Sequence, residues 1–191
     1  MTSSRDIRSE KGFSLVEMMV SVSLFAIIML VAVGALLALV DANRKARTLE
    51  SVMNNLNISL DSMVRAARMG THYNCNGSGI PGAVGADCAN GDDLFSFAPY
   101  GSDSTQQNER AVYFIQGGRI YRSLNGGTNS IPITAPEISI EELTFYVIGT
   151  QPGDITQPKV VVVVKGSAGN DEKTRTTFYI QATAVQRALD I

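Results

Sequence analysis

The sequence predicts an α+β protein in which one long N-terminal helix packs on an antiparallel β-sheet. Two observations predict this fold class. Residues 13–40 are almost entirely apolar and residues 41–70 are amphipathic, with no proline in either segment. After residue 93, short runs of Val, Ile, Phe and Tyr alternate with polar residues between Gly and Pro, a pattern typical of strands. The 191-residue length suits one domain plus a membrane anchor.

The apolar stretch 13–40 is long enough to span a membrane, because a hydrocarbon core of about 30 Å needs about 20 helical residues. Its non-apolar side chains are Ser14, Glu17, Ser21 and Ser23. Glu17 is the unusual one. A carboxylate inside a membrane costs about 2.5–3.5 kcal/mol on insertion scales, so Glu17 is a candidate functional residue.

Residues 1–12 form a polar leader that ends in Gly12. If a peptidase cuts after Gly12, Phe13 becomes a free amino terminus at the start of a helix. Glu17 lies four residues further on, on the same helix face. An amine on one subunit and a carboxylate on the next would neutralise each other only on assembly, which would set the register between them. The alternative is a plain signal anchor that carries a stray acid.

The segment Gly12-Phe13-Ser14-Leu15-Val16-Glu17 resembles the class III signal of type IV pilins and type II secretion pseudopilins. The resemblance implies the pilin fold, cleavage between Gly12 and Phe13 by prepilin peptidase, and N-methylation of Phe13. It implies that Glu17 contacts the terminal amine of an adjacent pilin or pseudopilin subunit. An inner-membrane assembly platform would be a further partner. The architecture is most similar to PilW-type minor pilins and J-type pseudopilins. Glu17 disfavours the K-type tip role.

The same motif implies an orientation in the inner membrane, with the leader in the cytoplasm and the head outside it. Basic residues flank the apolar stretch on both sides and do not decide the orientation. A secretory signal peptide cut near residues 32–34 is the main competitor. The length of the apolar stretch and the acid inside it argue against that alternative.

Residues 41–70 predict that the helix continues into the head, giving one helix of about 55–58 residues. Gly70 is the expected C-cap. Apolar residues recur at alternating steps of four and three, which is a heptad seam and would also suit a dimeric coiled coil. The alanines and methionines in the seam favour packing on the chain's own sheet. This predicted seam consists of Ala42, Ala46, Leu49, Met53, Leu56, Leu60, Met63 and Ala67.

Residues 71–92 are rich in glycine and predict a long loop, and the chain's two cysteines, Cys75 and Cys88, bracket much of it. In an oxidising compartment these two residues would form a disulfide. Closing a loop of this length stabilises by roughly 3 kcal/mol in the chain-entropy model. His72 lies nearby, but two Cys and one His at these spacings are not a recognised metal set. We expect no metal here and treat His72 as a solvated loop residue.

Residues 93–191 predict the β-sheet head. Segments 111–116 and 119–124 flank Gly117-Gly118, a two-residue hairpin signal that would pair Ile115 with Ile120 and Phe114 with Tyr121. A change of phase near Glu141-Glu142 predicts a bulge. The other predicted strands are 94–98, 138–147, the valine run 160–164 buried on both faces, and a long alternating strand 176–184.

Catalytic and nucleic-acid functions have little support in the sequence. The formal net charge is −2, whereas nucleic-acid binding needs a basic surface, and no cofactor motif is present. Adjacent acids such as Asp92-Asp93, Glu141-Glu142 and Asp171-Glu172 are expected to be solvated. A calcium site in loop 150–158 would have Asp154 as its only carboxylate.

Three functions remain. The favoured one is a structural subunit, a minor pilin or pseudopilin. The alternatives are an adhesin or DNA-uptake subunit that binds through loops 71–92, 101–109 and 125–136, and a membrane-anchored extracytoplasmic domain that never polymerises.

Overall fold

The computed structural model describes residues 12–75, 85–151, 153, 156–169 and 175–187. The chain divides into two compact units, residues 1–44 and residues 45–191, which are described separately. Most of the leader, the centre of the cysteine loop and part of loop 150–158 lie outside the described residues.

Helix α1 (Leu15–Met69) has 55 residues, and the prediction of one long helix is confirmed. In the first unit, every described side chain of α1 is exposed. Leucine, valine, isoleucine and methionine occupy all sides of the helix there, and they contact no other element of this unit. Burial in a hydrophobic core of this unit therefore does not stabilise this part of the helix.

In the second unit, α1 buries one face against the head. The buried residues are Val52, Leu56, Ser59, Leu60, Met63 and Ala67. The predicted seam is right from Leu56 onward and wrong upstream, where Ala42 and Ala46 are exposed and Val52 is more buried than Met53. The difference has a geometric cause. A straight helix drifts by about 20° per heptad, so a heptad seam moves off the contact face unless the helix supercoils.

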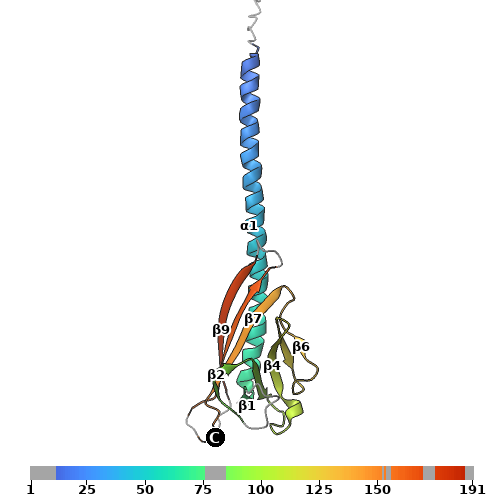
Figure 1. Ribbon diagram of the computed structural model, residues 1–191, viewed down its shortest axis with the longest axis vertical. Coiled ribbons are helices and arrows are strands. Elements are labelled where there is room, and N and C mark those ends of the chain that lie inside the picture. The colour runs from blue at the N-terminus through green and yellow to red at the C-terminus, as the bar shows by residue number, and fades with distance from the viewer. Residues whose placement is uncertain (1–11, 76–84, 152, 154–155, 170–174, 188–191) are drawn as a thin grey trace, which may run out of the picture. The chain divides into compact units, whose positions relative to one another are not determined.

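The predicted α+β class, a long N-terminal helix with antiparallel β-structure, is confirmed. The strands form two antiparallel sheets rather than one (Figure 1). The five-stranded sheet has the order β1 (Thr71–Asn74), β3 (Leu94–Ala98), β4 (Ala111–Gln116), β5 (Arg119–Ser123) and β6 (Ile131–Pro132). The four-stranded sheet has the order β2 (Cys88–Asp92), β7 (Ile138–Ile148), β8 (Lys159–Ala168) and β9 (Thr176–Val185). A 3-10 turn, η1 (Gln107–Glu109), lies in the loop before β4.

The predicted loop 71–92 accounts for this difference. Its two ends are strands rather than loop. β1 pairs with β3 in the first sheet, and β2 pairs with β7 in the second. Residues 71–74 and 88–92 lack regular apolar alternation, so the sequence gives no strand signal for either.

Two predicted registers are confirmed. In the β4–β5 hairpin, Ile115 pairs with Ile120 and Phe114 with Tyr121. In β7, the register with β8 shifts between Ile140 and Glu142, at the expected bulge. The extra residue turns both halves of the strand inward. Ile138, Ile140, Leu143, Phe145 and Val147 are therefore all buried.

Aromatic side chains join the two sheets. Phe95 of β3 and Phe145 of β7 stack with their ring centroids 5.4 Å apart. The Tyr73 ring meets Phe95 edge-on at 5.4 Å, and its hydroxyl donates to the Ala67 carbonyl of α1 at 2.7 Å. Tyr73 thus ties β1 to the last turn of the helix.

Helix α1 ends before Gly70, as predicted. Glycine suits this position because a side chain would have no room, and not because the residue adopts a left-handed cap conformation. A Cβ on Gly70 would overlap the Phe97 ring, and Gly70 has no positive φ. The left-handed residue is His72, with a φ of 55°. Its side chain is exposed, as expected, but its backbone belongs to β1 rather than to a loop.

Arg110, which is fully buried, holds the backbone at His72 in this left-handed conformation. Its Nη2 donates to the His72 carbonyl at 2.6 Å, and burial lowers the pKa of Arg110 to about 10.

Replacing Tyr73 by Phe tests the helix tie. Burial raises the pKa of Tyr73 well above its ordinary value of 10.0, and nearby Arg68 opposes part of the shift. The neutral Tyr73 hydroxyl therefore contributes its full stabilisation of the wild-type head below pH 10. Above pH 10, the free energy of unfolding falls by about 1.4 kcal/mol per pH unit. We expect Tyr73→Phe to cost about 1 kcal/mol at pH 7. By pH 11 the loss in the wild type exceeds this cost, so the gap between the two proteins should close in denaturant unfolding of the full chain in micelles.

Tyr113 and Arg110 also titrate at high pH, but both are present in the two proteins and cancel in the difference. A gap that stays the same at pH 7 and pH 11 would contradict the interpretation.

Candidate functional site

The first described residues precede the helix. Gly12, Phe13 and Ser14 are not helical, and α1 begins at Leu15. The Phe13 side chain is 81% exposed. The Gly12–Phe13 peptide bond therefore lies outside the helix, where its backbone takes no part in the helical hydrogen bonds.

Ser14 and Glu17 form a reciprocal capping box at this helix start. The Glu17 N–H donates to Ser14 Oγ at 3.2 Å, and the Ser14 N–H donates to Glu17 Oε2 at 3.2 Å. The Ser-x-x-Glu spacing is the signature of this motif, which is absent from the sequence-based predictions above. The box fixes where the helix begins and gives the Glu17 carboxylate a polar partner within its own chain.

The other polar side chains of the apolar stretch bond to the helix backbone. Ser21 Oγ donates to the Glu17 carbonyl at 2.7 Å, and Ser23 Oγ donates to the Met19 carbonyl at 2.8 Å. Glu17 is therefore the one ionisable side chain between residues 13 and 40. An ionised carboxylate accepts about four hydrogen bonds, and the Ser14 N–H uses one of them.

The helix that carries Glu17 is long and apolar enough to cross a membrane, by length and composition. None of its most apolar window is buried in the structure. Full burial of a Val, Leu, Ile, Phe or Met side chain stabilises by about 1.5–3 kcal/mol. A surface made of such residues therefore requires lipid or other apolar helices around it.

The sequence of this segment matches a family model. Residues 7–39 match the model described as the prokaryotic N-terminal methylation motif. This chain carries that motif. With the long helix and the antiparallel sheets, the motif is consistent with a type IV pilin-like protein or pseudopilin precursor. No curated protein and no solved structure matches the chain.

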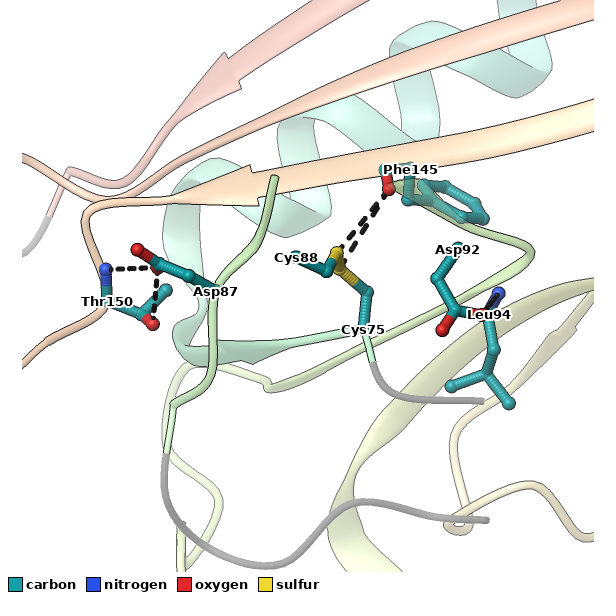
Figure 2. The surroundings of a disulfide bond; sticks show 7 residues. All are labelled: Cys75, Asp87, Cys88, Asp92, Leu94, Phe145 and Thr150. Carbon is teal, nitrogen blue, oxygen red and sulfur yellow. Dashed lines mark hydrogen bonds between the residues drawn. A yellow bond between two sulfur atoms is a disulfide. The ribbon is translucent and has the colours of Figure 1, made fainter. Parts of the chain in front are cut away.

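The second candidate site is the disulfide between Cys75 and Cys88, whose Cα atoms are 6.0 Å apart (Figure 2). Cys75 follows β1, the edge of the five-stranded sheet, and Cys88 opens β2, the edge of the four-stranded sheet. Their sulfur atoms lie 3.9 and 3.5 Å from the Phe145 carbonyl oxygen. The bond therefore fastens the two sheets together beside the Phe95–Phe145 ring pair.

Asp87 holds the strand end next to this disulfide. Its Oδ1 accepts hydrogen bonds from the Thr150 N–H at 2.9 Å and the Thr150 hydroxyl at 2.7 Å (Figure 2). Thr150 itself is buried. This carboxylate serves structure, because it fixes the start of β2 to the loop that follows β7.

In the part of the chain that the structure describes, the remaining acids make separate local contacts. Asp92 accepts from the Leu94 N–H at 3.3 Å, and Glu141 lies 3.9 Å from Lys165. Among the described residues, no three His, Cys, Asp or Glu side chains are arranged to hold a metal ion. Asp154, Asp171 and Glu172 lie outside the described residues. The motif and the fold suggest a structural protein.

Cys88→Ser should destabilise the head by about 3 kcal/mol, since the two cysteines are 13 residues apart in sequence. For a domain of this size we expect the melting temperature to fall by about 10 °C. A reducing agent should lower the melting temperature of the wild type to a similar value and leave the variant unchanged. If the wild type melts at the same temperature with and without the reductant, the disulfide does not stabilise the head.

Proposed function

We propose that the chain is a structural subunit, a minor pilin or pseudopilin, of a type IV pilus or type II secretion filament. Prepilin peptidase cuts between Gly12 and Phe13, Phe13 is N-methylated, and the mature chain enters a filament through residues 13–40. The observation that carries the proposal is the one acid, Glu17, one turn into an exposed apolar helix that carries the methylation motif.

The apolar surface of α1 is suited to two successive surroundings, the membrane and then the filament. In the inner membrane, lipid covers residues 13–40. In a filament, the same surfaces of neighbouring subunits cover it, with no loss of apolar burial. The exchange of lipid for protein is therefore nearly neutral for these side chains, and the polar groups decide the register.

Glu17 is suited to setting the register between neighbouring subunits. Before assembly, its carboxylate accepts the Ser14 N–H. Cleavage after Gly12 gives Phe13 a positive amine, and a neighbouring subunit can bring its amine to the acceptor positions that Ser14 leaves free. A charge pair away from water stabilises only when both partners are present, so a subunit in the wrong register leaves two unpaired charges.

The disulfide supports the location of the head. Disulfides persist in the periplasm and outside the cell and are rare in the cytosol. We infer a single-pass protein of the inner membrane whose head is extracytoplasmic and later belongs to a periplasmic or surface filament. Its partners are prepilin peptidase, other pilin or pseudopilin subunits and the assembly platform.

The mass of the amino-terminal peptide of the native protein tests the processing step. We expect a terminus at Phe13 whose mass is increased by one methyl group. An intact Met1 terminus would mean a plain membrane anchor, and a terminus near Ala35 would mean a secreted domain. Either of these would overturn the proposal.

Glu17→Ala tests the assembly step. The variant should be cleaved and remain in the membrane, but its amount in filaments should fall by about tenfold or more, because the neighbouring amine loses its partner. Quantitative immunoblots of isolated filaments and membranes give the ratio. Incorporation at the wild-type level would contradict the pairing.

Ser14→Ala is the matched control for this variant. It removes the Ser14 side of the capping box, at a cost of about 1 kcal/mol to the helix start, and leaves the Glu17 carboxylate in place. We expect near-normal incorporation. A loss as large as that of Glu17→Ala would assign the effect to helix capping rather than to charge pairing.

A further inference from the structure

Strand β9 (Thr176–Val185) forms one edge of the four-stranded sheet. Its ten residues pair with β8 on one side in an unbroken register from Lys159↔Val185 to Ala168↔Thr176. On its other side, no strand of the described residues pairs with it. β9 runs beside β8 at the outside of this sheet in Figure 1.

The register shows which backbone groups face outward. Just beyond β9, the Gln186 N–H donates to the Pro158 carbonyl, which continues the same register. Hydrogen-bonded pairs alternate with non-bonded pairs in an antiparallel ladder. Even-numbered residues of β9 therefore bond to β8, and the N–H and C=O groups of the odd-numbered residues point away from the sheet. These are Thr177, Tyr179, Gln181, Thr183 and Val185.

The other three edges are poorly suited to pairing. β6 has two residues and ends in Pro132, which has no N–H. β1 and β2 have four and five residues, and the register of each is irregular. Short, bulged or proline-containing edges are common protections against unwanted pairing. β9 has none of them, since it contains no proline, no glycine, no charge and no register shift.

The side chains of β9 also leave room for a further strand. On the face toward the core, Phe178 and Ile180 are only partly buried, although both pack against the core. On the opposite face, Tyr179 is 69% exposed. An added strand with apolar residues at alternate positions would complete the burial of Phe178 and Ile180.

We propose that β9 is a docking edge for an extended, uncharged strand of a different filament subunit, which adds antiparallel to β9 by backbone hydrogen bonds. This inference rests on the proposed function. It identifies the contact that the head makes, in addition to the contact made by the N-terminal helix.

A second copy of this chain does not fit the edge as an antiparallel strand. β9 runs in the same direction as the second half of α1. Its first residue, Thr176, pairs with Ala168 of β8, which in turn pairs with Ile138 of β7. Its other end leads to Arg187, whose N–H donates to the Arg68 carbonyl near the end of α1. In an antiparallel pair of β9 strands from two copies, the α1 helices of the two heads would therefore run in opposite directions. Subunits anchored in one membrane share one orientation, and edges β1, β2 and β6 offer no long regular strand.

A pair of variants at Gln181 tests the edge. Gln181→Pro removes one outward N–H and no bond to β8, whereas Gln181→Ala removes the same side chain and keeps the N–H. Both should melt close to the wild type as free proteins. In filaments, we expect the proline variant to fall at least about fivefold and the alanine variant to stay near the wild-type amount. Equal loss in both variants, or loss in neither, would overturn the proposal.

Amide hydrogen exchange at single-residue resolution gives a second test that does not depend on a variant. In the full chain alone in micelles, the odd-numbered amides of β9 should exchange fast and the even-numbered ones slowly. In isolated filaments, the odd-numbered amides should slow by at least about tenfold. Unchanged exchange of the odd-numbered amides in filaments would overturn the docking edge and leave the proposed function intact.

Two other outcomes separate the alternatives. Slow odd-numbered amides in the chain alone would mean that β9 pairs with a second copy, which overturns the assignment to a different subunit. A chain that is never found in a filament would overturn the proposed function and this inference with it.

Discussion

The apolar surface of residues 13–40 is the constraint on which the rest of the molecule depends. Covering these apolar side chains with lipid or with other apolar helices is favourable relative to leaving them in water. Dispersion and burial are similar in those two surroundings, which leaves the few polar groups to distinguish them. Ser21 and Ser23 bond to their own helix and carry no preference. Glu17 accepts the Ser14 N–H and keeps further acceptor capacity, which is the property on which the proposed pairing with a neighbouring amine rests.

The head meets a different requirement, because two sheets of five and four strands have to act as one support for the second half of α1. The ring pair Phe95–Phe145 and the Cys75–Cys88 disulfide lie where the sheets meet, and Tyr73 connects that region to the helix at Ala67. The covalent bond joins the ends of two short edge strands, β1 and β2, which belong to different sheets. Strands with few apolar residues need such a tie, since backbone pairing at a sheet edge stabilises little by itself.

The parts that the sequence predicts well are those where a period repeats. The helix, the β4–β5 register at Ile115 and Ile120, and the bulge near Glu141 all follow from periodicity and turn chemistry. β1 and β2 could not be predicted, because four or five irregular residues beside glycine become strands only by pairing with β3 and β7. The burial of Arg110 has no local signal either. Its guanidinium is held by the carbonyl of His72, 38 residues away, and by Ser96. The Ser14–Glu17 box does have a local signal, the Ser-x-x-Glu spacing at the start of an apolar run, and it gives the acid a partner within its own chain.

Strand β9 differs from the other edges of the two sheets in its length and regularity. In a protein that functions alone, a ten-residue edge without charge, proline or bulge is a hazard, because it offers a row of unpaired N–H and C=O groups to any passing strand. The valine run in β8 makes that hazard greater if β9 separates from it. Three edges of this head are short or irregular and one is long and regular. An edge of this kind is tolerable in a protein whose neighbours cover it, and in a filament subunit every surface that is costly in the free chain has a neighbour available to cover it.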